Sequence, residues 1–138
     1  MKTWLATLVM AVFFMAPAAG ATPAQETAAA QKSATAWLKL LDSGQYGESW
    51  NAASRYWKAD HTKEVTQRVL KEQRDLSGRV LSRQLSAATL LAVPDGDCVH
   101  IEFKTSFTKN RAARESIDML REESGAWKVA SWSWRVVD

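Results

Sequence analysis

Residues 98–108, which read CVHIEFKTSFT, alternate between apolar and polar side chains. Val99, Ile101, Phe103 and Phe107 fall on one side of an extended chain, and His100, Glu102, Lys104 and Ser106 fall on the other. This period of two predicts a β-strand with one buried face and one solvated face.

Turn signals lie on both sides of this strand, and further strand-like segments lie beyond them. PDGD at 94–97 precedes it, KNR at 109–111 follows it, and SGA at 124–126 separates a strand carrying Ile117 and Met119 from a tryptophan-rich strand at the C-terminus. In residues 79–93 one face is predicted to hold Leu81, Leu85, Ala87, Leu91 and Val93, with Arg83 and Thr89 on the same face. The sequence therefore predicts a four-stranded antiparallel meander.

Before Gly78 the apolar period is helical. The first helix carries Ala30, Ala34, Trp37, Leu38 and Leu41 on one face and ends near Gly44. A second, short helix is predicted from Tyr46, Trp50, Ala53 and Trp57, and a third from Thr62 to Gly78 with Val65, Val69 and Leu76 as its stripe. The expected fold is α+β, with N-terminal helices packed on a curved four-stranded antiparallel sheet.

The first residues are typical of a leader sequence. Lys2 is followed by an apolar run from Trp4 to Ala16 that is too short to span a membrane, and Ala19–Ala21 offers a small-x-small cleavage pattern. We predict a signal peptide over 1–21, a flexible mature N-terminus over 22–27 and a single domain over 28–138. The expected location is periplasmic or secreted, with no membrane span after cleavage.

Composition excludes several classes of protein. The net charge of +3 is small and spread along the chain, so it does not indicate a nucleic-acid partner. Cys98 is the only cysteine, which excludes an intramolecular disulfide. Two distant histidines and one cysteine do not form a structural zinc set, so we expect no metal and no cofactor.

Several quoted segments together resemble a known family. They are AWLKLLDSGQYGESW at 36–50, a polar helix that begins with TKE and ends with RDLSG, HIEFKTSF at 100–107 and SGAWKV at 124–129. From about Ala34 to Trp132 the chain resembles the bacterial secreted family called domain of unknown function 4019. The order of elements is also similar to nuclear transport factor 2-like (cystatin-like) proteins, which implies a cone-shaped sheet closed by helices. The family resemblance implies no activity.

The tryptophans are the candidate ligand-binding residues. Trp37, Trp50, Trp132 and Trp134 either fill the core or line a cavity for a small apolar ligand. On a regular strand Trp132 and Trp134 share a face with Ala130 and Val136, while Trp127 and Val129 point the other way. A bulge between Val129 and Trp132 would change which rings face inward.

The ionisable residues give no catalytic set. His61 lies beside a helix cap, and Cys98 and His100 share the polar face of a strand without a third partner. Asp42, Glu102 and Asp118 are the carboxylates considered for acid–base chemistry, but none is predicted to lie in an apolar pocket. Arg74 is interpreted as a structural bridge, with anion binding as the alternative.

We therefore expect an exported, non-catalytic module of the cell envelope that binds a small ligand or a protein partner. Two alternatives remain open at this stage. One is an acid–base enzyme of the isomerase or cyclase type, and the other is a structural subunit that forms a homodimer through its polar sheet face.

Overall fold

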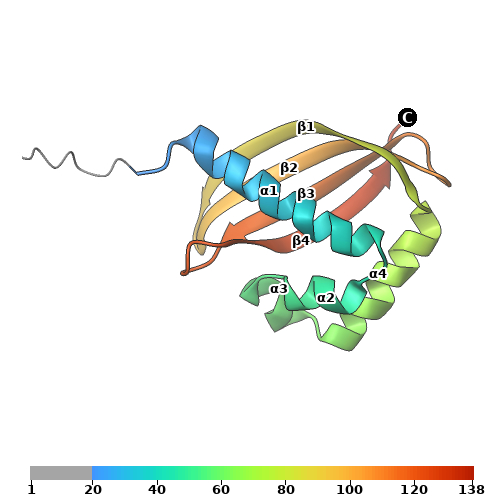
Figure 1. The fold of residues 1–138 in the computed structure, drawn as a ribbon, viewed down its shortest axis with the longest axis horizontal. Helices are drawn as coiled ribbons and strands as arrows, with labels where there is room; N and C mark the ends of the chain where they lie inside the picture. Colours follow the sequence, from blue (N-terminus) through green and yellow to red (C-terminus); the bar gives the residue numbers. More distant parts are fainter. Residues whose placement is uncertain (1–19) are drawn as a thin grey trace, which may run out of the picture.

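The computed structural model describes residues 20–138, and its backbone changes from helical to extended at Gly78 (Figure 1). Gly78 has a φ of 84°, and a Cβ at this position would collide with the Thr108 hydroxyl, so only glycine fits. The helices are α1 (Pro23–Asp42), α2 (Tyr46–Asn51), α3 (Arg55–Asp60) and α4 (Lys63–Ser77). The strands are β1 (Val80–Val93), β2 (Gly96–Phe107), β3 (Ala113–Arg121) and β4 (Trp127–Val136).

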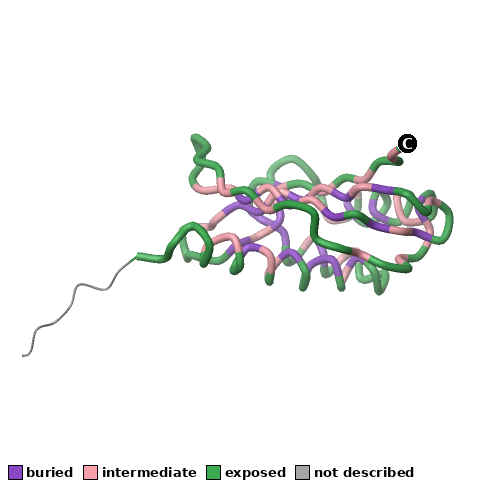
Figure 2. The backbone as a smooth tube through the Cα atoms, turned by 90° about the horizontal axis from the view of Figure 1, so that it is seen from above, coloured by how far each residue is buried: buried purple, intermediate pink, exposed green. Residues whose placement is uncertain are grey.

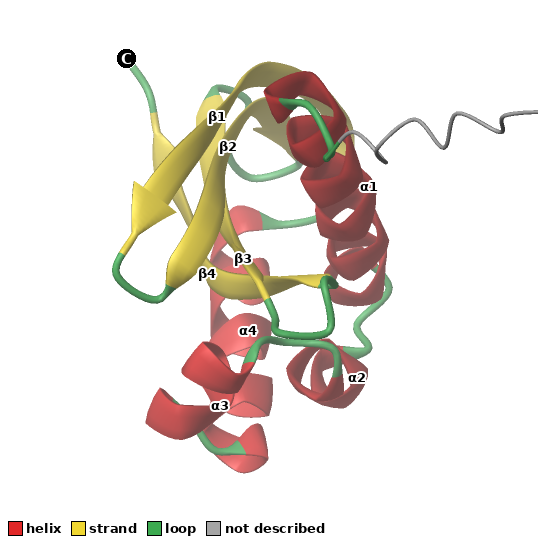
Figure 3. Ribbon diagram, turned by 90° about the vertical axis from the view of Figure 1, so that its left-hand side faces the viewer, coloured by secondary structure: helices red, strands yellow, loops and turns green. Residues whose placement is uncertain are grey.

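The four strands form one antiparallel sheet in the order β1-β2-β3-β4, which confirms the predicted meander and the α+β class. The sheet is curled but not closed. Figure 3 shows α1 along one face of the sheet, with α2, α3 and α4 continuing the helical layer below it. The similarity to nuclear transport factor 2-like proteins stays a prediction.

The start of α1 differs from the predicted flexible segment over 22–27. Thr22 and Gln25 form a capping box, in which each side chain bonds the other residue's backbone N–H, and Pro23 occupies the first helical position. Residues 23–27 are therefore the first turns of the helix. The predicted buried face of α1 is confirmed, because Ala30, Ala34, Trp37, Leu38 and Leu41 are all buried. The predicted signal peptide lies, up to residue 19, outside the described residues.

The second predicted helix is two helices, α2 and α3. Ser54 interrupts it with an extended backbone, and its side chain accepts a hydrogen bond from Trp57 N, which caps α3. The backbone N–H of Ser54 donates to Val129 O at 2.9 Å. The break therefore fastens the helical layer to β4.

The predicted stripe of α4 is wrong by about one position. Thr66, Leu70 and Ser77 are the buried residues, whereas Val69 is 40% exposed and Leu76 is 62% exposed. The small Thr66 faces the interior because its hydroxyl accepts a hydrogen bond from Trp57 Nε1 at 3.0 Å. Val69 is consequently left beside an opening in the surface.

Strand β1 also departs from its predicted single face, because its register shifts between Leu85 and Ala87. Before the shift Arg83 lies opposite Thr105 on the inner face, and after it Ala88 and Leu90 take the inner positions opposite Ile101 and Val99. Ala87, Leu91 and Val93 face outward instead. A bulge reverses the alternation of every residue that follows it.

A bulge in β4 decides the positions of the tryptophans. Val129 lies opposite Met119 and Ser131 lies opposite Asp118, so Ala130 is the extra residue. Trp132 and Trp134 consequently share the helix-covered face with Trp127. The predicted opposition between these rings on a regular strand is wrong, and the bulge considered between Val129 and Trp132 is present.

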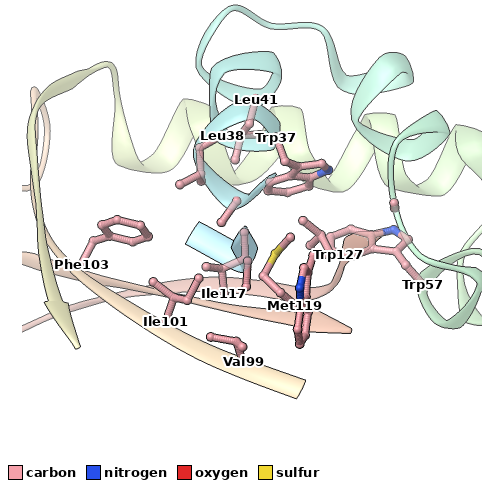
Figure 4. Packing of buried hydrophobic residues seen from close by; sticks show 14 of the residues in the cluster. Trp37, Leu38, Leu41, Trp57, Val99, Ile101, Phe103, Ile117, Met119 and Trp127 are labelled. Carbon is pink, nitrogen blue, oxygen red and sulfur yellow. The ribbon is translucent and has the colours of Figure 1, made fainter. Parts of the chain in front are cut away.

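The core lies between α1 and the inner face of the sheet. Figure 4 shows Trp37, Leu38 and Leu41 above Ile101, Ile117 and Met119, with Trp57 and Trp127 at one end and Phe103 at the other. Seen from above, buried positions recur along the middle strands and the inner side of α1, and exposed positions cover the outside (Figure 2).

Candidate functional site

Most of the tryptophan rings are fixed by hydrogen bonds from their indole nitrogens. Trp37 donates to Ser49 O at 2.9 Å, Trp50 to His61 O at 2.8 Å and Trp57 to Thr66 Oγ1 at 3.0 Å. Trp132 donates to Glu115 Oε2 at 3.1 Å, and Trp134 to Gln73 Oε1 at 3.0 Å. The indoles are therefore structural parts of the interior, and the site must be sought where two of them border empty space.

Such a space lies between α3, α4 and β4. It is a cavity of about 270 Å³ lined by Trp57, His61, Val65, Thr66, Val69, Leu70, Gln73 and Trp132. Its lining is mainly apolar, with two indoles among the surrounding side chains. Among the described residues, the His61 ring and the Gln73 amide nitrogen have no hydrogen-bond partner, so both are available to a ligand.

The four predicted site residues are divided by the structure. Trp132 lines this cavity, and its ring centroid lies 6.4 Å from that of Trp37. Trp37 instead borders a more open groove of about 400 Å³ beneath α1, together with Met119 and Trp127. Trp50 and Trp134 line neither space. Trp50 lies under the ammonium group of Lys58, 5.1 Å from the ring centroid, and Trp134 packs edge-on against Phe107.

A carboxylate that the sequence reasoning missed lies on the other side of Trp132. Glu115 is completely buried, and four hydrogen bonds reach its two oxygens. Arg83 donates from Nε at 2.7 Å and from Nη2 at 3.1 Å, Thr105 donates its hydroxyl at 2.6 Å, and Trp132 donates its indole N–H. Glu115 is thus a fully paired anion behind the wall of the cavity, not a lining residue.

Asp42 extends the Arg83–Glu115 ion pair to the helices, because it also pairs with Arg83 and with Arg74. Arg83 Nη1 lies 2.8 Å from Asp42 Oδ2, and Arg74 Nη2 lies 2.9 Å from Asp42 Oδ1. Asp42, at the end of α1, therefore joins β1 and α4. This agrees with the structural interpretation of Arg74, although the bridge runs to another helix end.

Burial alone would lower the pKa of Arg83, because it disfavours the charged guanidinium. The hydrogen bonds from Arg83 to Asp42 and Glu115 outweigh this effect and raise its pKa above the usual value. Arg83 therefore stays charged inside the protein, and Glu115 keeps its counter-ion.

A sequence signal for this pair existed. Glu115 is in phase with Ile117 and Met119, and Arg83 falls on the face that Leu81 and Leu85 were assigned to. An acid and a base on the apolar phases of two strands of one sheet indicate a buried ion pair. His61, Gln73 and Trp57 had no comparable signal, because the cavity depends on the angle between α3 and α4.

The outer face of the sheet carries the other candidate residues. His100 Nδ1 lies 2.6 Å from Asp118 Oδ1, and Ser131 donates its hydroxyl to Asp118 Oδ2 at 2.6 Å. Glu102 lies 3.3 Å from Arg114 and 3.6 Å from His100. The hydrogen bond to Asp118 is the main reason that the pKa of His100 is raised. Asp118 separates the serine from the histidine, so this row is not a nucleophilic triad.

Cys98 lies on this outer face, two residues from His100 as predicted. Burial, followed by the nearby negative charge of Asp118, raises the pKa of the Cys98 thiol. The reactive thiolate is thereby disfavoured, which is the opposite of what a catalytic cysteine needs.

Residues 20–138 contain neither a metal-binding cluster nor a helix fit to cross a bilayer. No group of three or more His, Cys, Asp or Glu side chains in this range is close enough to hold a metal ion. In the same range, none of the helices combines the length and apolar character needed to span a bilayer.

Comparison with known proteins places the chain in a family. The profile described as "Protein of unknown function (DUF4019)" matches residues 33–132. The chain belongs to the DUF4019 family. A solved structure from Catenulispora acidiphila is similar to this DUF4019 chain, with a TM-score of 0.54 and 13% sequence identity over 78% of this chain and 88% of the other. At that identity the likeness shows the fold alone. A search of curated protein sequences found no match.

Proposed function

We propose that this DUF4019 protein is a non-catalytic binding module for a small, mainly apolar molecule, held in the cavity between α3, α4 and β4. The observation that supports this proposal is the lining of the cavity. Two indoles and three aliphatic side chains surround a space of about 270 Å³, with the His61 ring and the Gln73 amide at its polar positions. Small-molecule sites commonly combine an apolar wall with a few polar groups that orient the ligand.

The volume and the lining suggest the class of ligand. A space of this size suits one aromatic ring with a single polar substituent, because drug-sized pockets start at roughly 300 Å³. The rings of Trp57 and Trp132, each tilted relative to Trp37, offer faces and edges for aromatic contact. The ligand's polar group would bond His61 or Gln73.

Binding is favoured over the acid–base alternative by the position of the acid. An acid–base enzyme of this type needs a carboxylate or an imidazole that is buried in the cavity and reaches the substrate. His61 lines the cavity, but it is an exposed residue. No Asp or Glu is among the described residues that line the cavity, and both oxygens of Glu115 are already occupied by hydrogen bonds. Trp132 stands between Glu115 and the empty space.

The test uses indole as the ligand, observed by saturation-transfer NMR, and two variants of α4. Val69→Phe places a ring in the cavity, while Leu76→Phe adds the same ring to the same helix outside it. We expect saturable binding to the wild type and to Leu76→Phe, and loss of binding in Val69→Phe. Absence of binding to the wild-type protein, or equal binding by both variants, would overturn the proposal.

We also propose that the protein acts in the cell envelope after export, on the basis of the leader pattern in residues 1–21. Fractionation of the producing cell with N-terminal sequencing of the purified protein tests this separately. The expected N-terminus lies near Thr22. A protein that keeps Met1 and stays in the cytoplasm would contradict export without affecting the cavity proposal.

A further inference from the structure

The outer face of the sheet gathers positive charge at one end, although the charge of the sequence is small overall. Lys104 lies directly opposite Arg114, and Arg114 lies directly opposite Arg135, so three cations form a row across β2, β3 and β4. Like charges directly opposite each other on neighbouring strands destabilise a sheet. A bound anion would offset this repulsion.

The protein itself supplies little negative charge at this row. Glu102 lies 3.3 Å from Arg114 Nη1, and it is the one acid that pairs with any of the three cations among the described residues. Lys104 and Arg135 are exposed and form no ion pair there. Arg114 Nε is buried and has no hydrogen-bond partner. The positive charges of Lys104 and Arg135, and the buried donor Arg114 Nε, thus have no partner among the described residues.

A groove lies over one end of this row, where β2 and β3 meet the turn that joins them. It has a volume of about 310 Å³, and its polar lining includes Ser82, Gln84, Lys104, Ser106, Arg111 and Arg114. No carboxylate is among the described lining residues. Arg111, from the turn, is exposed and adds a further unpaired cation. The hydroxyl and amide groups can donate hydrogen bonds between the cations.

We propose that this groove binds the phosphate group of a phosphate-bearing ligand. A phosphate has about two negative charges and three acceptor oxygens, which match several cations and hydroxyl donors better than the single charge of a carboxylate does. Guanidinium groups suit phosphate because they donate two parallel hydrogen bonds. This site is separate from the cavity between α3, α4 and β4 and does not depend on the proposal made for it.

The experiment compares a free and a membrane-borne phosphate. Isothermal titration calorimetry with pyrophosphate at low ionic strength measures the first. Co-sedimentation with vesicles of phosphatidylglycerol, against vesicles of phosphatidylcholine, measures the second. Lys104→Gln/Arg111→Gln removes two exposed cations from the groove. Lys32→Gln/Arg68→Gln is the matched control, because it removes one Lys and one Arg that are exposed on α1 and α4.

We expect the groove variant to weaken binding by about tenfold or more, since each lost contact is a charge-assisted hydrogen bond. The control variant should bind like the wild type. Loss of pyrophosphate binding would assign the groove to a soluble ligand, and loss confined to phosphatidylglycerol vesicles would assign it to a lipid headgroup. Binding of neither ligand, or equal weakening by both double variants, would overturn the proposal.

Discussion

The two faces of the sheet differ in how their charged side chains are surrounded: those on the inner face are largely buried and paired, and those on the outer face are exposed or partly exposed to solvent. On the inner face Glu115 is completely buried and the Arg83 side chain is 15% exposed, and two hydrogen bonds join the two side chains. On the outer face Lys104, Arg114 and Arg135 stand in a row of like charge, and Glu102 is the one acid among the described residues that pairs with any of them. Burial forces charges to find partners, while solvent lets them remain unpaired and free to meet a ligand.

The comparison assigns different roles to similar residues. Glu115 is the kind of buried acid that suggests catalysis, yet its partners make it a structural anchor between β1, β2, β3 and β4. The exposed cations look like ordinary surface residues, yet their register leaves them without matching anions.

The largest decrease in the free energy of unfolding is expected for Glu115→Gln. This change replaces one of the two acids that pair with the Arg83 guanidinium by a neutral amide. Because Asp42 remains as a partner of Arg83, we expect a cost of about 3 kcal/mol, at the lower end for a broken buried ion pair. The matched change, Glu102→Gln on the outer face, should lower the free energy of unfolding by no more than about 1 kcal/mol. Urea denaturation measures both. Equal effects would show that the inner pair is no more important than a surface pair.

A smaller effect is expected for Trp132→Phe. The variant loses the hydrogen bond from the indole N–H to the Glu115 carboxylate, which we expect to cost about 2 kcal/mol because the acceptor is charged and buried. Trp50→Phe loses a hydrogen bond to the exposed carbonyl of His61 and should cost about 1 kcal/mol or less. Thermal denaturation of both variants gives the comparison. A larger loss in Trp50→Phe would contradict it.

The smallest expected change is the pH dependence of the free energy of unfolding that His100, on the outer face, contributes. The pKa of His100 in the folded protein is raised above the unfolded value of about 6.5, chiefly by the hydrogen bond with Asp118. The resulting stabilisation is complete below pH of about 6.5 and is lost as the pH rises through the higher folded pKa. Because His100 is partly exposed, the change should stay below about 1 kcal/mol.

Denaturation between pH 5 and pH 9 and an NMR titration of the His100 ring test this dependence. Asp118→Asn should return the His100 pKa toward its ordinary value and remove most of the pH dependence. A His100 pKa that does not change in this variant would show that Asp118 is not the cause.

The α+β class and the meander could be predicted from the sequence, because the period of the apolar residues changes at Gly78. The face of each residue within a strand could not always be predicted. A bulge at Ser86 turned Leu91 and Val93 outward, and the extra Ala130 brought Trp132 inward. Neither Ser86 nor Ala130 is a glycine or a proline, so the sequence gives no signal of either bulge.

The candidate site was predicted less completely than the fold. Trp132 was named, but Trp57, His61 and Gln73 come from separate helices, and their meeting depends on how α3 and α4 pack. Glu115 was missed although its phase along β3 matched that of Ile117 and Met119. An acid in an apolar phase is therefore a signal of a buried partner that deserves the same weight as the apolar pattern itself.

The central claim is that the space beside Trp132 receives a ligand while Glu115 behind it stays in its ion pair. A crystal structure of the protein soaked with indole tests both parts together. The account predicts a ring between Trp57 and Trp132, with the Arg83–Glu115 hydrogen bonds unchanged. An empty cavity at saturating indole, or a ligand that displaces Trp132 and contacts Glu115 directly, would contradict it.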